Sequence, residues 1–224
     1  AAINTEYWES APCLSPDKKH LYFASDRPGG YGGSDIYVST RMPNGKWSLP
    51  QNLGSTINTG GDESCPFMHA DNETLYFNSN GHEGFGGADL FLSKKSSNGF
   101  LTPQNLGFPI NTINDEGSLF VTADASTGYF ASDRSDTKGG LDIYVIQLGT
   151  NIQPSTTSWV EGRVYDSASG KGLMAIVEVI DLESKVVVSE LEADGQGNYL
   201  SVLPLGKNYA LNVSKKGYLF YSGR

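Results

Sequence analysis

Cationic side chains and cysteine are both scarce in this sequence. Lysine and arginine number 16 against 25 aspartates and glutamates, so the 224-residue chain carries a net charge of −9. Because nucleic-acid affinity depends mainly on clustered cations, this balance predicts no nucleic-acid partner. The two cysteines, Cys13 and Cys65, are too few for a zinc cage or a disulfide-dense scaffold.

Long apolar runs and catalytic motifs are absent as well. No run approaches the roughly 20 residues that a bilayer-spanning helix needs, so no transmembrane segment is predicted. The three histidines, His20, His69 and His82, share no metal-ligand spacing, and no Gly-x-Ser-x-Gly elbow occurs. The sequence therefore predicts no catalytic residue, no cofactor and no metal ligand, and we expect the protein not to be an enzyme.

What the sequence does contain is a repeat in its first 150 residues, with periods of 54 and 53. Residues 21–27 (LYFASDR) recur as 75–81 (LYFNSNG) and 128–134 (GYFASDR), and residues 32–37 (GGSDIY) recur as 86–91 (GGADLF) and 139–144 (GGLDIY). Residues 50–54 and 103–107 both read PQNLG. The triplet Ile-Asn-Thr begins at positions 3, 57 and 110, so residue 3 is expected to lie in the tail of a preceding copy.

Each copy of the repeat predicts four short strands, because apolar segments are separated by Gly, Pro, Asn and Asp. In the first copy these strands are expected around residues 11–14, 20–24, 35–39 and 46–49. No stretch shows a helical period. Four strands in a repeat of this length are typical of a propeller blade, and three blades are fewer than a closed propeller needs. The sequence therefore predicts an all-β fold that contains part of a β-propeller of four-stranded blades.

The character of the sequence changes after a Ser/Thr-rich stretch at residues 153–158 (QPSTTS). Beyond it, β-branched segments at 160–166, 175–181, 185–190 and 209–213 alternate with turn signals such as residues 194–198 (DGQGN). We expect three parts: propeller repeats over residues 1–152, a linker over 153–158 and a small β-sandwich over 159–224.

Both parts resemble known families. The repeat, with Ser-Pro-Asp at 15–17 before LYFASDR and then GG-x-DIY, resembles the WD40-like, TolB-type propeller repeat. Residues 160–166 (VEGRVYD), 194–199 (DGQGNY) and 216–220 (KGYLF) are similar to a carboxypeptidase-regulatory-like domain. The order of the two resembles OmpA-family periplasmic proteins of Bacteroidetes, including the PorE-like components of type IX secretion.

This resemblance implies a non-enzymatic, protein-binding scaffold in the periplasm, associated with the outer membrane. Its implied partners are outer-membrane-associated secretion components. In that family a downstream OmpA domain binds peptidoglycan, and no residue of this sequence matches that domain.

Two Asp-Arg pairs that follow a strand in the repeat are candidates for partner or ligand contact. Asp26 with Arg27, and Asp133 with Arg134, could present arginine forks that bind carboxylates. The alternative is structural, because an aspartate after a strand commonly accepts backbone hydrogen bonds in its own turn. The middle copy has Asn-Gly at these positions, which would break a ring of forks. A Ca²⁺ ion shared by Asp26 and Asp35 is a further alternative to a plain turn.

Aromatic side chains in loops are the other contact candidates. Tyr31 and Phe85 occupy equivalent positions in the Gly-rich loop, and Phe100 lies in a later loop. Such residues either fill gaps between blades or contact a partner.

Two further functions stay open beside the scaffold. One is a propeller that gates substrate entry to a larger hydrolase, whose catalytic half would lie outside these residues. The other is a periplasmic sensor that binds a glycan or a peptide in a central channel.

Overall fold

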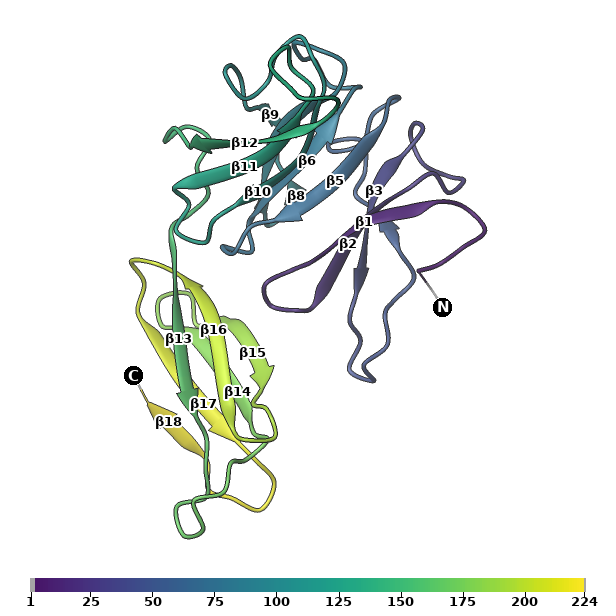
Figure 1. Ribbon diagram of the computed structural model, residues 1–224. Helices are drawn as coiled ribbons and strands as arrows, with labels where there is room; N and C mark the ends of the chain where they lie inside the picture. The colour runs from purple at the N-terminus through teal and green to yellow at the C-terminus, as the bar shows by residue number, and fades with distance from the viewer. Residues whose placement is uncertain (1–2, 224) are drawn as a thin grey trace. The chain divides into compact units, whose positions relative to one another are not determined.

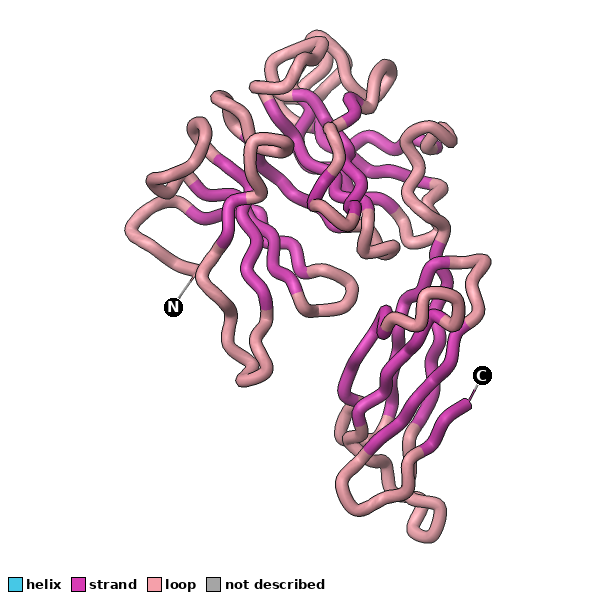
Figure 2. Tube along the Cα trace, turned by 180° about the vertical axis from the view of Figure 1, so that it is seen from behind, coloured by secondary structure: helices cyan, strands magenta, loops and turns pink. Residues whose placement is uncertain are grey.

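The described part of the chain folds into strands and loops. The computed structural model describes residues 3–223, and Figures 1 and 2 show strands and loops but no helix among them. The all-β class predicted from the sequence is confirmed, and none of the described residues offers a helical membrane span. The chain divides into two compact units, Ala1–Ser155 (unit 1) and Thr156–Arg224 (unit 2). Strand β13 starts at Thr157, so the last two residues of the expected linker already belong to a strand.

Unit 1 consists of three antiparallel sheets, one for each copy of the repeat (Figure 1). The first repeat sheet contains β1 (Glu9–Leu14), β2 (His20–Ser25), β3 (Asp35–Thr40) and β4 (Gln51–Asn52) in that order. The second repeat sheet contains β5 (Glu63–Met68), β6 (Thr74–Ser79), β7 (Asp89–Ser96), β8 (Gly99–Phe100) and β9 (Gln104–Asn105), with both β8 and β9 paired to β7. Within the described residues, the third repeat sheet contains three strands, β10 (Glu116–Val121), β11 (Thr127–Ser132) and β12 (Asp142–Gln147).

The third strand of each copy begins where the repeat predicts, at Asp35, Asp89 and Asp142. Each of these carboxylates fixes the loop that precedes its own strand. In the first copy the backbone N–H of Tyr31 donates to Asp35 at 2.6 Å, and in the third copy the N–H of Lys138 donates to Asp142 at 2.7 Å. The aspartate therefore ends the loop and starts the strand.

The expected fourth strand over residues 46–49 is wrong. Trp47 forms only an isolated bridge with Arg41, and the fourth strand is the two-residue β4 in the PQNLG segment. The side-chain amide of Asn52 donates to the carboxylate of Asp35 at 2.7 Å, which holds β4 beside β3. Two residues give too short an alternation for a pattern search to find.

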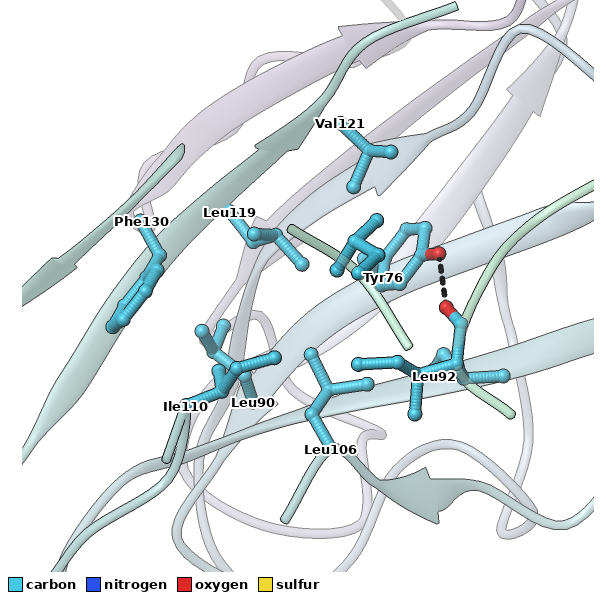
Figure 3. Close-up of a cluster of buried hydrophobic side chains, with 10 residues drawn as sticks. Tyr76, Leu90, Leu92, Leu106, Ile110, Leu119, Val121 and Phe130 are labelled. Atoms are coloured by element: carbon cyan, nitrogen blue, oxygen red, sulfur yellow. Dashed lines mark hydrogen bonds between the residues drawn. The ribbon is translucent and has the colours of Figure 1, made fainter. Parts of the chain in front are cut away.

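The repeat sheets pack face to face through two apolar clusters. One cluster joins the first and second sheets and contains Tyr22, Ile36, Ile57, Met68, Leu75, Phe77 and Phe91. The other joins the second and third sheets and contains Tyr76, Leu90, Leu92, Leu106, Ile110, Leu119, Val121, Phe130, Leu148 and Ile152 (Figure 3). Full burial of one large apolar side chain stabilises a fold by about 1.5–3 kcal/mol, so these clusters hold unit 1 together.

An asparagine from the Ile-Asn-Thr segment that connects two successive sheets completes the edge of the sheet before it. The side chain of Asn58 accepts the N–H of Ile36 at 2.8 Å and donates to the Ile36 carbonyl at 3.0 Å. Asn111 makes the same two bonds with Leu90, both at 2.8 Å. Each side-chain amide therefore donates and accepts as the backbone of a neighbouring strand would. The two asparagines and the two residues that they bind, Ile36 and Leu90, are all fully buried.

Glycines in the loop before the third strand let the next copy approach closely. A Cβ atom on Gly32 would lie 2.1 Å from the carbonyl oxygen of Gly61, and one on Gly86 would lie 2.3 Å from that of Asn114. The neighbouring Gly33 donates its N–H to the Gly61 carbonyl at 2.9 Å. The Gly-Gly pair of the repeat is therefore needed for contact between copies.

Unit 2 contains two antiparallel sheets. One pairs β13 (Thr157–Arg163) with β16 (Asn198–Pro204), and the other has the order β15 (Val187–Glu192), β14 (Ile176–Asp181), β17 (Tyr209–Ser214), β18 (Tyr221–Gly223). The hydroxyl of Ser201 in the first sheet donates to that of Ser189 in the second at 2.8 Å, in a buried position. Strands β16 and β18 have no counterpart among the segments expected from the sequence.

Adding a methyl group at Gly32 tests the close approach of the copies. We expect Gly32→Ala to lower the free energy of unfolding by about 1–3 kcal/mol, because the backbone of the next copy must move. Gly60→Ala is the matched control, since a Cβ atom there meets nothing within 4 Å. Denaturant unfolding of both variants measures the difference, and equal stability would show that the loops do not need the glycine.

Candidate functional site

The six candidate contact residues lie at one end of the repeat sheets. At this end the second strands finish and the first and third strands begin. We call it the loop end of unit 1; it comprises residues 26–34, 59–62, 80–88, 112–115 and 133–141. The six residues share this end of the sheets but belong to different copies and do not form one cluster. They are Asp26, Arg27, Tyr31, Phe85, Asp133 and Arg134.

The guanidinium group of Arg134 is held inside its own copy of the repeat. Its Nη2 donates to the carbonyl of Ile110 at 2.8 Å and lies 3.4 Å from the buried carboxylate of Glu116. The group also lies over the rings of Phe130 and Tyr144, at 5.1 and 4.6 Å from their centroids. Most of its donors and one of its faces are therefore used within unit 1.

Arg27 makes the equivalent contacts in the first copy. Its Nη2 donates to the carbonyl of Ile3 at 2.8 Å and to the carboxylate of Glu9 at 3.1 Å. Its guanidinium group lies 5.1 and 5.0 Å from the ring centroids of Phe23 and Tyr37. Neither arginine is an open fork for a ligand carboxylate in this arrangement.

In the second copy a histidine takes the place of the arginine. The ring of His82 donates from Nε2 to the carbonyl of Ile57 at 2.8 Å and lies 5.9 and 5.2 Å from the rings of Phe77 and Phe91. Gly81 is the residue that aligns with the arginines. The sequence comparison missed this substitution because the histidine comes one residue later and reaches the same carbonyl from there.

A buried glutamate below each loop is a structural residue that the sequence analysis did not single out. Glu63 is fully buried and accepts the N–H and the hydroxyl of Thr59, at 2.7 and 2.6 Å, and the hydroxyl of Ser79 at 2.6 Å. Glu116 is bound in the same way in the third copy. The spacing Thr-x-x-x-Glu, which occurs at 5/9, 59/63 and 112/116, is the signal that could have found this network.

The carboxylates of Asp26 and Asp133 are exposed, and each also accepts a hydrogen bond from a backbone N–H group. Asp26 accepts the N–H of Trp8 at 2.8 Å, and Asp133 accepts the N–H of Asp115 at 2.9 Å. Asn80 accepts the corresponding N–H in the second copy, so an amide oxygen serves as well as a carboxylate. Each residue ties the start of a first strand to the end of the second.

Tyr31 and Phe85 are the candidates that point outward. Their side chains are 54% and 57% exposed, although the N–H groups of both residues donate to the buried aspartates Asp35 and Asp89. Phe100 instead packs edge-on against Tyr22, with ring centroids 6.4 Å apart, and fills the space between the first two sheets. The loops thus hold two aromatic rings in solvent on a fixed backbone.

Exposed carboxylates lie in the loops at the same end of the sheets. The exposed acidic residues of the loop end are Asp26, Asp62, Glu83, Asp115, Asp133 and Asp136. Lys138 is an exposed cation in the same region. The loop end is therefore an acidic surface that carries aromatic side chains.

The opposite end of the sheets holds a second set of buried polar contacts. Asp71 is 3% exposed and accepts the N–H groups of Glu73 and Thr74 at 3.0 and 2.9 Å and the N–H of Ser155 at 2.9 Å. Burial acts to raise the pKa of Asp71, but the hydrogen bonds that its carboxylate accepts, among them those of Glu73 and Thr74, outweigh it and hold that pKa well below its usual range. These contacts stabilise the ionised form.

The two thiols are free. Cys13 accepts the N–H of Met68 at 3.2 Å between the first two sheets, and burial raises its pKa. Cys65 lies in β5, beside the hydroxyl of Ser64. Among residues 3–223, no three His, Cys, Asp or Glu side chains group so as to hold a metal ion.

Comparison with solved structures shows a likeness to a protein of known structure. No family model and no curated protein matches the chain. The crystal structure of TolB from Acinetobacter baumannii aligns with 99% of this chain at 14% identity and a TM-score of 0.48. The alignment covers 44% of the TolB chain, so this chain spans less than half of that protein's length.

Replacing the guanidinium group tests the structural role of Arg134. We expect Arg134→Lys to lower the free energy of unfolding by about 1–2 kcal/mol, because a single ammonium group cannot bind the Ile110 carbonyl, the Ser132 hydroxyl and the Glu116 carboxylate at once as the guanidinium group does. Arg41→Lys, at an exposed position, is the control. Chemical denaturation checks both variants, and a loss below about 0.5 kcal/mol for Arg134→Lys would contradict the assignment.

Acid titration tests the ionised state of Asp71. Because its pKa is lower in the folded chain than in the unfolded one, its contribution to stability is full above about pH 4 and is lost as pH falls toward the folded pKa. Asp71→Asn should therefore cost about 2 kcal/mol at neutral pH, and the cost should shrink below about pH 4. Unfolding curves across pH measure it, with the exposed Glu83→Gln as the control; a cost that does not depend on pH would contradict this account.

Proposed function

We propose that this protein is a non-enzymatic scaffold that binds another protein through the loop end of unit 1. The observation that carries the proposal is the pair of exposed rings, Tyr31 and Phe85, at equivalent positions in successive copies. Aromatic side chains on a fixed backbone bury a large area at low entropic cost, which is why they dominate binding energy at interfaces.

The backbone under both rings is fixed before any partner binds. Asp35 accepts N–H groups from Tyr31 and Gly32 at 2.6 and 3.2 Å, and the amide of Asn52 holds the same carboxylate. Gly33 adds a bond to the following copy. Loops of this kind lose little freedom on binding, so more of the contact energy is available as affinity.

The charge of the loop end indicates the kind of partner. Six exposed carboxylates lie there, with Lys138 as an exposed cation, and both arginines of the region are bound within their own sheets. A partner with a basic surface matches this charge, and the attraction would raise the rate of encounter at low salt.

We also propose that these residues catalyse no reaction. The polar residues that the repeat places at equivalent positions are bound to backbone or to each other: Asp26 to Trp8, Arg134 to Ile110, and Glu63 to Thr59. Such groups hold loops in place. None of these contacts has the arrangement of a nucleophile, a base and a group that orients the base.

The finer assignment rests on the sequence resemblance. We infer that the three repeat sheets are blades of a β-propeller and that unit 2 is a carboxypeptidase-regulatory-like sandwich. By the same resemblance the protein acts in the periplasm, at the outer membrane, beside components of type IX secretion. Peptidoglycan binding would belong to a downstream OmpA domain and not to these residues.

Removal of the two rings tests the proposal. We expect Tyr31→Ala/Phe85→Ala to weaken capture of the partner from a cell-envelope extract by about 10-fold or more, because each ring acts as an anchor. The exposed Leu49→Ala is the matched control and should leave capture unchanged. Added salt should weaken capture by the parent chain, since the surface is acidic.

Two results would contradict the proposal. One is undiminished capture by the double variant, or by a chain that lacks residues 1–158. The other is turnover of peptide or glycoside substrates by the purified chain.

A further inference from the structure

Loops of successive copies meet at two places in the loop end. At the first junction the loop at residues 30–34 contacts residues 59–62, and at the second junction the loop at 84–88 contacts residues 112–115. The backbone arrangement is the same at both, because in each case a Gly-Gly pair lies against a backbone carbonyl of the following segment. The side chains differ, and the differences concern both apolar surface and charge.

The second junction presents more apolar surface. Ile113 is 85% exposed, and its equivalent at the first junction is Gly60. A Cβ atom on Gly86 would lie 2.8 Å from the carbonyl carbon of Ile113, so the segments that carry Phe85 and Ile113 adjoin. The second junction therefore exposes an aromatic and an aliphatic side chain on adjoining segments, whereas the first has Tyr31 beside a glycine.

The second junction also has the stronger negative charge. The exposed carboxylate of Asp133 accepts the N–H of the exposed Asp115 at 2.9 Å. At the first junction the equivalent pair is Asn80 and Asp62, where the amide of Asn80 accepts the Asp62 N–H at 2.7 Å and also donates to the Asp62 carboxylate at 3.1 Å. A carboxylate at position 133 cannot donate, so Asp115 lacks the partner that Asp62 has.

Two carboxylate oxygens of the second junction are left without a donor. One oxygen of Asp115 accepts the N–H of Ala88 at 2.9 Å, and the other accepts no hydrogen bond from the described residues. Below the same loop, Asp89 is 1% exposed; one of its oxygens accepts the N–H of Phe85, and the other has no hydrogen-bond partner among the described residues. The equivalent carboxylate at the first junction, that of Asp35, uses both of its oxygens.

These features match a cationic side chain that stands next to an apolar one. Lysine and arginine donate hydrogen bonds and accept none, and three carboxylates at one junction attract their charge. The neighbouring guanidinium group of Arg134 pairs with the buried Glu116 instead. An aromatic ring beside an aliphatic side chain covers an apolar residue, and the face of the ring also attracts a cation.

We propose that the second junction binds a segment of a partner protein in which an apolar residue is flanked by lysine or arginine. The binding residues are Phe85, Ile113, Asp115 and Asp133. The inference rests on the proposed function and narrows the loop end to one site and one class of peptide. The first junction, where glycine and asparagine take two of these places, should bind such a segment far more weakly.

Fluorescence anisotropy with a labelled peptide tests the site. The probe has a leucine between pairs of lysines; one control peptide has serine in place of leucine, and the other has glutamate in place of lysine. The parent chain should bind the probe about 10-fold more tightly than either control, since the site uses both features. Ile113→Ala and Asp133→Asn should each weaken binding of the probe by about 5-fold or more.

Both substitutions should leave the fold intact, which matching unfolding midpoints would verify. Ile113 is exposed, and in the second copy the amide of Asn80 already accepts the N–H that Asp133 accepts in the third. Asp133→Asn therefore removes a charge and keeps the acceptor. Leu49→Ala, at an exposed apolar residue outside the loop end, should bind the probe like the parent chain.

Conversion of the first junction into a likeness of the second gives the sharpest result. Gly60→Ile/Asn80→Asp supplies the missing apolar side chain and the missing carboxylate, and a Cβ atom on Gly60 meets nothing within 4 Å. This double variant should bind two probe peptides for each chain, where the parent chain binds one. Isothermal titration calorimetry counts them.

Several results would overturn the inference. The parent chain could fail to bind the probe, or could bind either control peptide as tightly. Ile113→Ala and Asp133→Asn could bind the probe like the parent chain, or the converted first junction could gain no second peptide.

Failure of this inference is distinguishable from failure of the proposed function. Loss of probe binding in Tyr31→Ala, with none in Ile113→Ala or Asp133→Asn, would move the contact to the first junction and leave the proposed function standing. Undiminished capture of the partner from a cell-envelope extract by Tyr31→Ala/Phe85→Ala would instead contradict the proposed function itself.

Discussion

Burial of one sheet face by the next copy of the repeat is the constraint on which unit 1 depends. A single sheet of three or four short strands has two faces and cannot bury either by itself. Tyr76, Leu90 and Leu92 line one face of the second sheet and are covered by Leu119, Val121 and Phe130 of the third (Figure 3). The stability of each copy is therefore shared with its neighbours, as in other repeat proteins.

Polar contacts give this apolar packing its register. Asn58 and Asn111 each bind both backbone groups of one residue in the preceding sheet, so a shift of one residue would leave a buried amide without partners. Most of the polar side chains that the repeat presents are used in this structural way. That use leaves the exposed rings and carboxylates of the loop end as the residues available to a partner.

The sequence predicted the fold well where the pattern is long and repeated. The third strands start at Asp35, Asp89 and Asp142 because each carboxylate binds the loop before it, and the repeat shows that aspartate three times. Short or displaced features were missed. Strand β4 has two residues, and His82 fills the arginine position from one residue further along. The burial of Glu63 and Glu116 depends on threonines and serines from separate segments, which only the folded chain brings together.

Amide hydrogen exchange at three equivalent residues tests the dependence of one copy on the next most directly. The N–H groups of Ile36 and Leu90 are bound by asparagine side chains from the segment that leads to the next sheet, and the third strand β12 lacks such a neighbour among the described residues. The amides of Ile36 and Leu90 should exchange slowly and that of Ile143 rapidly. Equal protection of all three amides would contradict the account.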